Sequence, residues 1–205
     1  MPFDPLNDLP PHDRRGFFRA GLGRLLRPVA GYIEKRLPAE LLDARPLLRP
    51  PGALPETAFL DTCHRCGRCA EACPASAIAL IASMDDRIDG TPHVVPSHQA
   101  CVICDDLSCM KVCPSGALRL CAAHEIRMGL AVVDHETCLR SDGEDCTICV
   151  EQCPIGTDAI HVDDSGAVVV IDPTATGRGC TGCGVCEQQC PTRPTRAIFV
   201  QPTAR

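Results

Sequence analysis

The chain has 205 residues, a formal net charge of −6, no tryptophan, one tyrosine and five phenylalanines. This length suits one or two domains, but so few aromatic side chains leave little bulk for an ordinary core, and 19 prolines with 16 glycines indicate many turns. The acidic balance argues against nucleic-acid binding, and no apolar run approaches the roughly 18 residues of a membrane span.

Residues 1–50 form a basic N-terminal segment that holds nine of the chain's 20 lysines and arginines. Within it, Phe17–Ile33 has apolar side chains at helical spacing and basic residues opposite them, which predicts an amphipathic helix. The proline-rich passage Arg45–Gly52 follows and is predicted to be a linker. We therefore expect two parts, this basic segment and a cysteine-rich part over residues 51–205.

A pair of arginines, Arg14 and Arg15, precedes this helix in a sequence that looks like a twin-arginine export signal. However, Arg24 and Arg27 interrupt what should be an uncharged apolar middle, and no A-x-A cleavage site follows. Two locations stay open: export to the periplasm, or retention with residues 14–36 lying on a membrane surface or a partner. The charge pattern favours, by a narrow margin, a cytoplasmic protein or one peripheral on the inner membrane.

Four groups of four cysteines, each ending in Cys-Pro, span residues 63–74, 101–114, 138–154 and 180–191. Their cysteines are Cys63, Cys66, Cys69 and Cys73; Cys101, Cys104, Cys109 and Cys113; Cys138, Cys146, Cys149 and Cys153; and Cys180, Cys183, Cys186 and Cys190. The first and fourth groups have the C-x2-C-x2-C-x3-C-P spacing of bacterial [4Fe–4S] ferredoxins, and the other two lengthen one internal gap. The pattern predicts four [4Fe–4S] clusters held by these sixteen thiolates, and such clusters chiefly transfer electrons.

The cysteine spacing has a geometric reason. Two-residue gaps fold the chain into a tight loop whose thiolates converge and whose N–H groups point inward. The fourth cysteine, followed by a proline that turns the chain outward, reaches a neighbouring cluster. Zinc sites use two separated C-x2-C pairs and need neither a third close cysteine nor the proline. Disulfide bonds are disfavoured as well, because cysteines this close in the sequence do not bridge comfortably. The remaining cysteine, Cys121, lies outside every group and is predicted to pack in the core.

Short β-like runs recur between the cysteine groups, which makes the chain an internal repeat. Runs that follow a group are Ala77–Ala82, Ala117–Leu120, Ala159–Val162 and Ala197–Val200, and runs that precede one are His93–Pro96, Leu130–Asp134 and Ala167–Ile171. With a short helix after each cluster loop, this order predicts an α+β fold of repeated bacterial-ferredoxin-like dicluster units. We expect two pseudo-symmetric units, with short strands and helices around four cubane clusters.

Several stretches are distinctive beyond the cysteine spacing. They are Leu48–Ala53, Val112–Leu118, Arg127–Val132, the seven-residue gap between Cys138 and Cys146, and Cys180–Gly184. Together they resemble the NapG/MauM family of ferredoxin-type proteins from bacterial periplasmic nitrate reduction and methylamine oxidation. The resemblance covers most of the chain and implies a four-cluster electron carrier between a quinol-oxidising membrane partner and a redox enzyme, with the family's ligands mapping onto the sixteen grouped cysteines.

The sequence contains no Ser-His-Asp set, P-loop or G-x-G-x-x-G loop, so catalysis has no support. The predicted function is therefore an electron carrier or electron-transfer subunit that is not itself an enzyme. The alternative is an iron–sulfur assembly or maturation factor for a partner redox enzyme. The acidic loop Leu139–Asp145 could dock a basic partner, although a solvated loop is the plainer interpretation.

Two pairings of the cysteine groups stay open. In a tandem scheme, group one pairs with two and group three with four; in a nested scheme, group two pairs with three and group one with four. The run Cys104-Asp-Asp-Leu-Ser-Cys109 looks like the second group of DMSO-reductase-type electron-transfer subunits, which are nested, and this likeness favours nesting. The nested sets are Cys63, Cys66 and Cys69 with Cys190; Cys180, Cys183 and Cys186 with Cys73; Cys101, Cys104 and Cys109 with Cys153; and Cys138, Cys146 and Cys149 with Cys113.

Overall fold

The computed structural model describes residues 46–203, except for the side chains of residues 175 and 176. The predicted twin-arginine-like motif, the amphipathic helix Phe17–Ile33 and the membrane contact through residues 14–36 lie outside the described residues. The structure therefore bears on the cysteine-rich part and on the end of the predicted linker.

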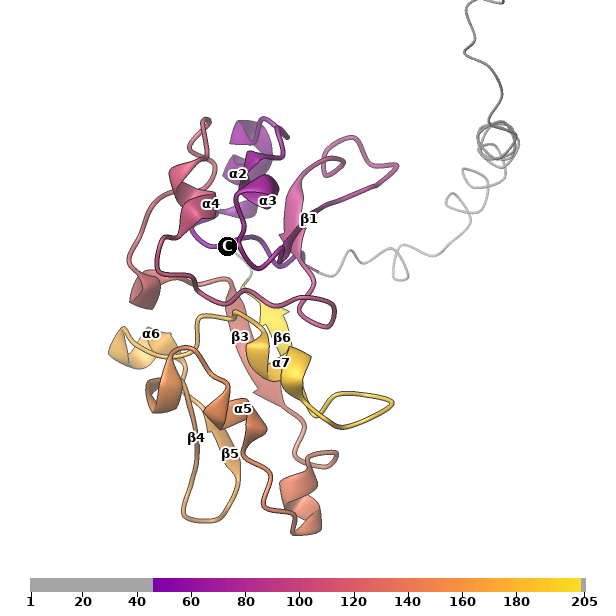
Figure 1. Cartoon of the computed structure of the whole chain (residues 1–205), viewed down its shortest axis with the longest axis vertical. Helices are drawn as coiled ribbons and strands as arrows, with labels where there is room; N and C mark the ends of the chain where they lie inside the picture. The colour runs from indigo at the N-terminus through magenta and orange to yellow at the C-terminus, as the bar shows by residue number, and fades with distance from the viewer. Residues whose placement is uncertain (1–45, 204–205) are drawn as a thin grey trace, which may run out of the picture. The chain divides into compact units, whose positions relative to one another are not determined.

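The described chain is an α+β fold of short elements in two regions, an N-terminal region over residues 46–126 and a C-terminal region over residues 127–203 (Figure 1). All strands pair antiparallel, two by two. The pairs are β1 (Ile78–Leu80) with β2 (Pro92–Val94), β3 (Gly129–Val133) with β6 (Ile198–Pro202), and β4 (Ile160–Val162) with β5 (Val168–Val170). Six of the seven predicted runs are thus strands, with no end shifted by more than two residues.

In the C-terminal region the first strand pairs with the last, and the two inner strands form a hairpin. Strand β3 pairs with β6 over five residues, from Gly129 opposite Pro202 to Val133 opposite Ile198, and β4 and β5 pair over three. The N-terminal region has the inner hairpin, β1 with β2, but no outer ladder among the described residues.

The prediction of a strand over Ala117–Leu120 is wrong. This segment makes a single antiparallel bridge, between Leu118 and Ala53, with one backbone hydrogen bond on either side. Pro51 and Pro55 lie two residues before and after Ala53. Because a proline has no N–H to donate, the ladder cannot extend in either direction, and the segment stays a bridge.

A helix of about one turn lies inside each cysteine group. The four helices are α3 (Arg68–Glu71), α4 (Ser108–Lys111), α5 (Ile148–Glu151) and α7 (Val185–Gln189). Each contains the third cysteine of its group and ends before the fourth, so the predicted short helix lies within the group rather than after it. The other helical elements are α2 (Glu56–Thr62), α6 (Pro173–Thr176) and the 3-10 helices η2 (Ala123–Glu125), η3 (Leu139–Asp142) and η4 (Gly156–Asp158).

Figure 1 shows α2, α3, α4 and β1 in one half of the described chain and α5, β4 and β5 in the other, with β3, β6 and α7 between them. Among residues 46–203, no helix has the length and apolar character needed to cross a membrane.

Each region has its own cluster of buried apolar side chains. The N-terminal cluster surrounds the fully buried Phe59 and contains Ile78, Val94, Met110 and Ile126 among others. The C-terminal cluster is made of small aliphatic side chains and cysteines. Its buried members are Ala131, Ala159, Ile160, Val168, Cys180, Cys186, Cys190, Ala197 and Ile198. Cysteines thus supply core volume that aromatic side chains provide in other proteins.

The end of the predicted linker is buried in the N-terminal region. Arg49 is only 7% exposed, and its guanidinium donates to both carboxylate oxygens of Glu56 at 2.6 and 2.9 Å. It also donates to Thr91 Oγ1 and to the carbonyl of Pro92, each at 2.9 Å, and lies 4.7 Å from the ring centroid of Phe59. The cysteine-rich part therefore begins before the predicted boundary at residue 51.

Candidate metal centres

The sixteen grouped cysteines line four cavities, each with three cysteines from one group and the last cysteine of another. We number the sites by the group that contributes three thiols. Site 1 holds Cys63, Cys66, Cys69 and Cys113; site 2 holds Cys101, Cys104, Cys109 and Cys73; site 3 holds Cys138, Cys146, Cys149 and Cys190; and site 4 holds Cys180, Cys183, Cys186 and Cys153. The structure brings the predicted residues together in sets of four, and their role as ligands stays a prediction.

These sets follow the tandem scheme, so the nested scheme favoured by the sequence is wrong. Helix α3 runs from Cys69 in site 1 towards Cys73 in site 2, while α4, packed against it, runs from Cys109 in site 2 towards Cys113 in site 1. Helices α5 and α7 connect sites 3 and 4 in the same way. The likeness to nested subunits reflects only the gap within group two, which is local and does not determine the partner group.

The cysteine loops of sites 1, 2 and 4 share an unusual backbone. Two positions after the first cysteine, φ is positive at Arg65 (53°), Ile103 (48°) and Gly182 (73°). Two positions before the third cysteine, it is again positive at Gly67 (75°), Leu107 (46°) and Gly184 (87°). Left-handed residues in such loops turn successive N–H groups to one side, as in an anion-binding nest. A positive φ at a β-branched residue such as Ile103 is rare and is typical of functional sites.

Four backbone N–H groups donate to cysteine sulfurs at 3.3 to 3.5 Å. The donors are Ala77 to Cys73 (3.3 Å), Leu118 to Cys113 (3.4 Å), Ala131 to Cys180 (3.5 Å) and Arg65 to Cys63 (3.5 Å). Such bonds favour the thiolate over the thiol and, in iron–sulfur proteins, set part of the reduction potential.

Burial makes many of these thiols hard to ionise without a cation. Burial raises the pKa of Cys69 and Cys149 to about 11, raises that of Cys101, Cys109 and Cys183 to about 12, and moves that of Cys180 and Cys186 upward as well. A thiol in this condition loses its proton when it bonds to a metal ion. Four thiols around one apolar cavity, with N–H donors directed at the sulfurs, therefore fit an iron–sulfur cluster.

A hydroxyl group contacts one sulfur in site 1 and one in site 3. Ser115 Oγ lies 3.6 Å from Cys113 Sγ, and Thr192 Oγ1 lies 3.1 Å from Cys190 Sγ. Burial alone would raise the pKa of both thiols, but hydrogen bonds from these hydroxyls and from nearby backbone N–H groups outweigh it and lower the pKa of each.

Each of these hydroxyl oxygens also accepts a hydrogen bond from the backbone. The backbone N–H of Ala117 donates to Ser115 Oγ at 3.4 Å, and that of Ala197 donates to Thr192 Oγ1 at 2.7 Å. A thiolate that holds a cluster would have no proton to donate, so there the hydroxyl proton would be the one shared with the sulfur. The corresponding positions after Cys73 and Cys153 hold alanine and isoleucine, so sites 2 and 4 have no such hydroxyl.

The stretched third group is held in place by Arg140, which sequence analysis did not single out. Its Nε donates to the carbonyl of Gly166 at 2.5 Å, and its Nη1 donates to Asp145 at 2.9 Å and to the carbonyl of Cys146 at 3.2 Å. The guanidinium thus joins the loop to the β4–β5 turn and positions Cys146 at site 3. The only sequence signal was an arginine inside an acidic insertion.

The extra cysteine, Cys121, lies outside all four sets. It is half-buried, packs against the N-terminal core, and its Sγ lies 3.9 Å from Met110 Sδ. This is the packing position predicted for it.

Comparisons with known proteins agree with this site. Residues 62–117 match a 4Fe-4S dicluster domain, and this range contains groups one and two, which share sites 1 and 2. The chain is 46% identical to ferredoxin-type protein NapG of Escherichia coli (strain K12) over 88 residues. It is 42% identical over 120 residues to the methylamine utilization ferredoxin-type protein MauM of Paracoccus denitrificans (strain Pd 1222), and 40% identical over 128 residues to that of Methylobacillus flagellatus.

The chain is similar to NapG and MauM. This confirms the resemblance inferred from the sequence. The matched stretches cover 42%, 58% and 59% of this chain, and 38%, 47% and 53% of the three relatives, so the chain spans about half or less of the length of the relatives it matches. The similarity to NapG and MauM, together with the cysteine sets, supports [4Fe–4S] clusters and a ferredoxin-type role in electron transfer.

Proposed function

We propose that this chain is an electron carrier, not an enzyme, that holds four [4Fe–4S] clusters in two dicluster units, one in each region. The sixteen cysteines of sites 1 to 4 are the proposed ligands. The observation that carries the proposal is the composition of each cavity, three thiols from one group and the last thiol of its neighbour. Two-cluster bacterial ferredoxins exchange their fourth ligand in the same manner. Bound clusters supply reversible one-electron storage and transfer.

The residues around the thiols have two tasks in this function. Apolar side chains such as Val133, Ile148 and Ile198 in site 3 keep water away from the thiolates. Backbone N–H groups and the hydroxyls of Ser115 and Thr192 compensate the negative charge that remains on the sulfurs. Together they allow a charged group to remain in a low-dielectric interior.

The proposed donor is a quinol-linked membrane protein, and the proposed acceptor is a separate oxidoreductase. Support comes from the similarity to NapG and MauM, of which MauM is named for methylamine utilization. Both names describe ferredoxin-type proteins, which favours a carrier over an assembly factor. The proposed location, cytoplasmic or peripheral on the inner membrane, and the proposed docking role of residues 14–36 rest on the charge pattern of that segment alone.

Metal analysis of anaerobically purified protein tests this proposal. We expect brown protein with about 16 iron and about 16 acid-labile sulfide per chain, four of each per cluster. Stoichiometric zinc without sulfide would contradict it. A carrier should also be re-oxidised during turnover of its partner enzyme, whereas an assembly factor becomes dispensable once the partner is mature.

A further inference from the structure

The two regions meet where the loop of site 2 touches the loop of site 4. The backbone N–H of Cys101, the first cysteine of site 2, donates to the carbonyl oxygen of Cys183, the second cysteine of site 4, at 3.0 Å. Among the described residues, this is the one backbone hydrogen bond that joins cysteines of different regions. A through-bond route between thiols of the two regions therefore runs through two of the cysteine residues and this one hydrogen bond.

Close packing reinforces the contact between these loops. Gly184 follows Cys183, and a Cβ atom at Gly184 would lie 2.4 Å from Pro96 Cβ, well inside van der Waals distance. The φ of Gly184 is also +87°, so glycine meets two requirements here. The loop of site 4 thus lies directly against the segment that leads into site 2.

One side chain of α7 forms hydrogen bonds with the same segment. Gln188 accepts the N–H of Ala100 at 3.2 Å through Oε1, and its Nε2 donates to the carbonyl of His98 at 3.1 Å and to Gln99 Oε1 at 3.3 Å. Ala100 is fully buried and immediately precedes Cys101. An α7 side chain therefore holds the entry to site 2 against the helix that carries Cys186 of site 4.

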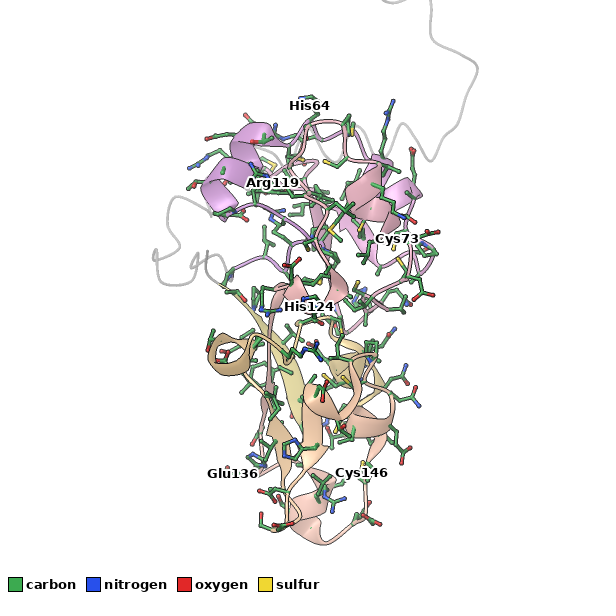
Figure 2. All side chains as sticks on the ribbon, turned by 90° about the vertical axis from the view of Figure 1, so that its left-hand side faces the viewer. His64, Cys73, Arg119, His124, Glu136 and Cys146 are labelled. Atoms are coloured by element: carbon green, nitrogen blue, oxygen red, sulfur yellow. The ribbon has the colours of Figure 1, made fainter. Side chains whose placement is uncertain are left out.

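Burial distinguishes the middle of the molecule from one of its ends. The three loop thiols of site 4 are buried, whereas Cys66 of site 1 is exposed. Figure 2 shows His64, which lines site 1, at one end of the described chain and Cys146 of site 3 at the other, with Cys73 of site 2 between them. Helices α3 and α4 already join sites 1 and 2, and helices α5 and α7 join sites 3 and 4.

We propose that the four sites form a single line in the order 1, 2, 4, 3, with outside partners exchanging electrons at sites 1 and 3, and with Gln188 as the positioning residue of the middle link. This inference rests on the proposed function, because it needs a cluster in each site. Each transfer oxidises one site and reduces its neighbour by one electron, so the electron lost by the quinol-linked donor is the one gained by the oxidoreductase, and the chain returns to its starting state.

Pulsed EPR of the reduced, full-length protein tests the order through magnetic interactions between neighbouring sites. Cys66→Ser and Cys146→Ser identify the signals of sites 1 and 3 by altering one ligand in each. We expect interactions for the pairs 1–2, 2–4 and 4–3 and none between sites 1 and 3. In Gln188→Ala the 2–4 interaction should weaken while the 1–2 and 4–3 interactions stay unchanged. Gln189→Ala is the matched control, because Gln189 is the next residue of α7, is exposed, and has no side-chain hydrogen bond within residues 46–203.

An interaction between sites 1 and 3, or the absence of a 2–4 interaction in the unaltered protein, would overturn the order. An unchanged 2–4 interaction in Gln188→Ala would remove Gln188 from the middle link while leaving the order intact. Fewer than four reducible signals in the unaltered protein would instead overturn the proposed four-cluster function, and the order with it. If Gln188→Ala does not fold, the order can still be judged from the unaltered protein, with its signals identified through Cys66→Ser and Cys146→Ser.

Discussion

In the N-terminal region the first and last segments are joined by one bridge, between Ala53 and Leu118. In the C-terminal region they are joined by a five-residue ladder between β3 and β6. Where the ladder is missing, the buried guanidinium of Arg49 joins α2 to the segment that begins β2. Both regions nevertheless surround two sets of four thiols. Different contacts can therefore join the ends of a region around the same arrangement of cysteines, because the thiols require only that these ends be held together.

The two regions also differ in which group is stretched. In the N-terminal region the second group has the long gap, between Cys104 and Cys109, and an exposed ion pair of Lys111 with Asp106 lies beside it. In the C-terminal region the first group has the long gap, and Arg140 fixes it by three hydrogen bonds, two of them to backbone carbonyls. Insertions are tolerated in either group because the helix that carries the third cysteine keeps its place.

The largest expected effect concerns the pairing of groups within each region. Cys63→Ala combined with Cys113→Ala should lose one cluster, about four iron atoms, because both thiols line site 1. Under the nested scheme the same pair would belong to different sites, and about eight iron atoms would be lost. Iron and sulfide analysis of anaerobically purified variants measures the difference.

Two further variants serve as controls for the pairing. Cys63→Ala with Cys190→Ala should lose two clusters, because these thiols line sites 1 and 3. Cys121→Ser should leave iron content unchanged, because Cys121 lies outside every set. Iron loss from Cys121→Ser would show that the ligand set is misassigned.

The second prediction concerns Arg49, whose hydrogen bonds take the place of the missing ladder. Arg49→Ala should destabilise the N-terminal region by about 3 kcal/mol, because it leaves buried acceptors without their donor and opens space beside Phe59. On heating, the absorbance of sites 1 and 2 should then be lost before that of sites 3 and 4. Arg49→Lys should recover only part of the stability, since an ammonium cannot bond both carboxylate oxygens of Glu56 in the same fork. A single transition for all four sites would contradict this account.

The third prediction compares two glycines of the N-terminal region that have the same φ of +74°. A Cβ at Gly52 would lie 2.2 Å from the carbonyl oxygen of Arg119, whereas one at Gly116 would have no atom within 4 Å. Gly116→Ala should therefore cost about 1 kcal/mol from backbone strain alone, and Gly52→Ala about 2 kcal/mol more from overpacking. Chemical denaturation of the two variants measures the difference, and equal costs would show that the bridge can shift without loss.

The smallest expected effect tests a feature that both regions share. Ser115→Ala should lower the reduction potential of site 1, and Thr192→Val that of site 3, because a hydroxyl donor to sulfur stabilises the more negative, reduced state. A difference of about 1 kcal/mol for such a bond corresponds to roughly 40 mV for a one-electron couple. Potentiometric EPR titration gives the values, and Ser115→Thr should keep the original potential. A drop at sites 2 or 4 would contradict the local origin of the effect.

Local patterns predicted most of the fold. The alternating and β-branched runs indicated six of the seven proposed segments correctly, because a strand of three to five residues needs little beyond its own side chains and a nearby partner. The run Ala117–Leu120 failed because its partner segment, around Ala53, is flanked by prolines, and nothing within the run shows which segment will lie opposite.

Functional side chains outside the cysteine groups were less visible in the sequence. Arg49, Arg140 and Gln188 act through partners five to 90 residues away along the chain. An arginine or glutamine with such partners looks like any surface residue until the fold brings the acceptors together. The hydroxyls of Ser115 and Thr192 could more easily have been predicted, since each stands two residues after a cysteine.

The cysteine spacing by itself determined that the first three thiols of groups one and four converge on one cavity, because gaps of two residues make a loop too short to do otherwise, and it predicted the same for the two groups with one longer gap. It also predicted the iron–sulfur, ferredoxin-type character that the similarity to NapG and MauM supports. Only the tertiary structure decided where the fourth thiol of each group goes. That thiol leaves its loop at the end of a one-turn helix, so it reaches whichever group packs against that helix, and the packing of α3 on α4 and of α5 on α7 made the arrangement tandem.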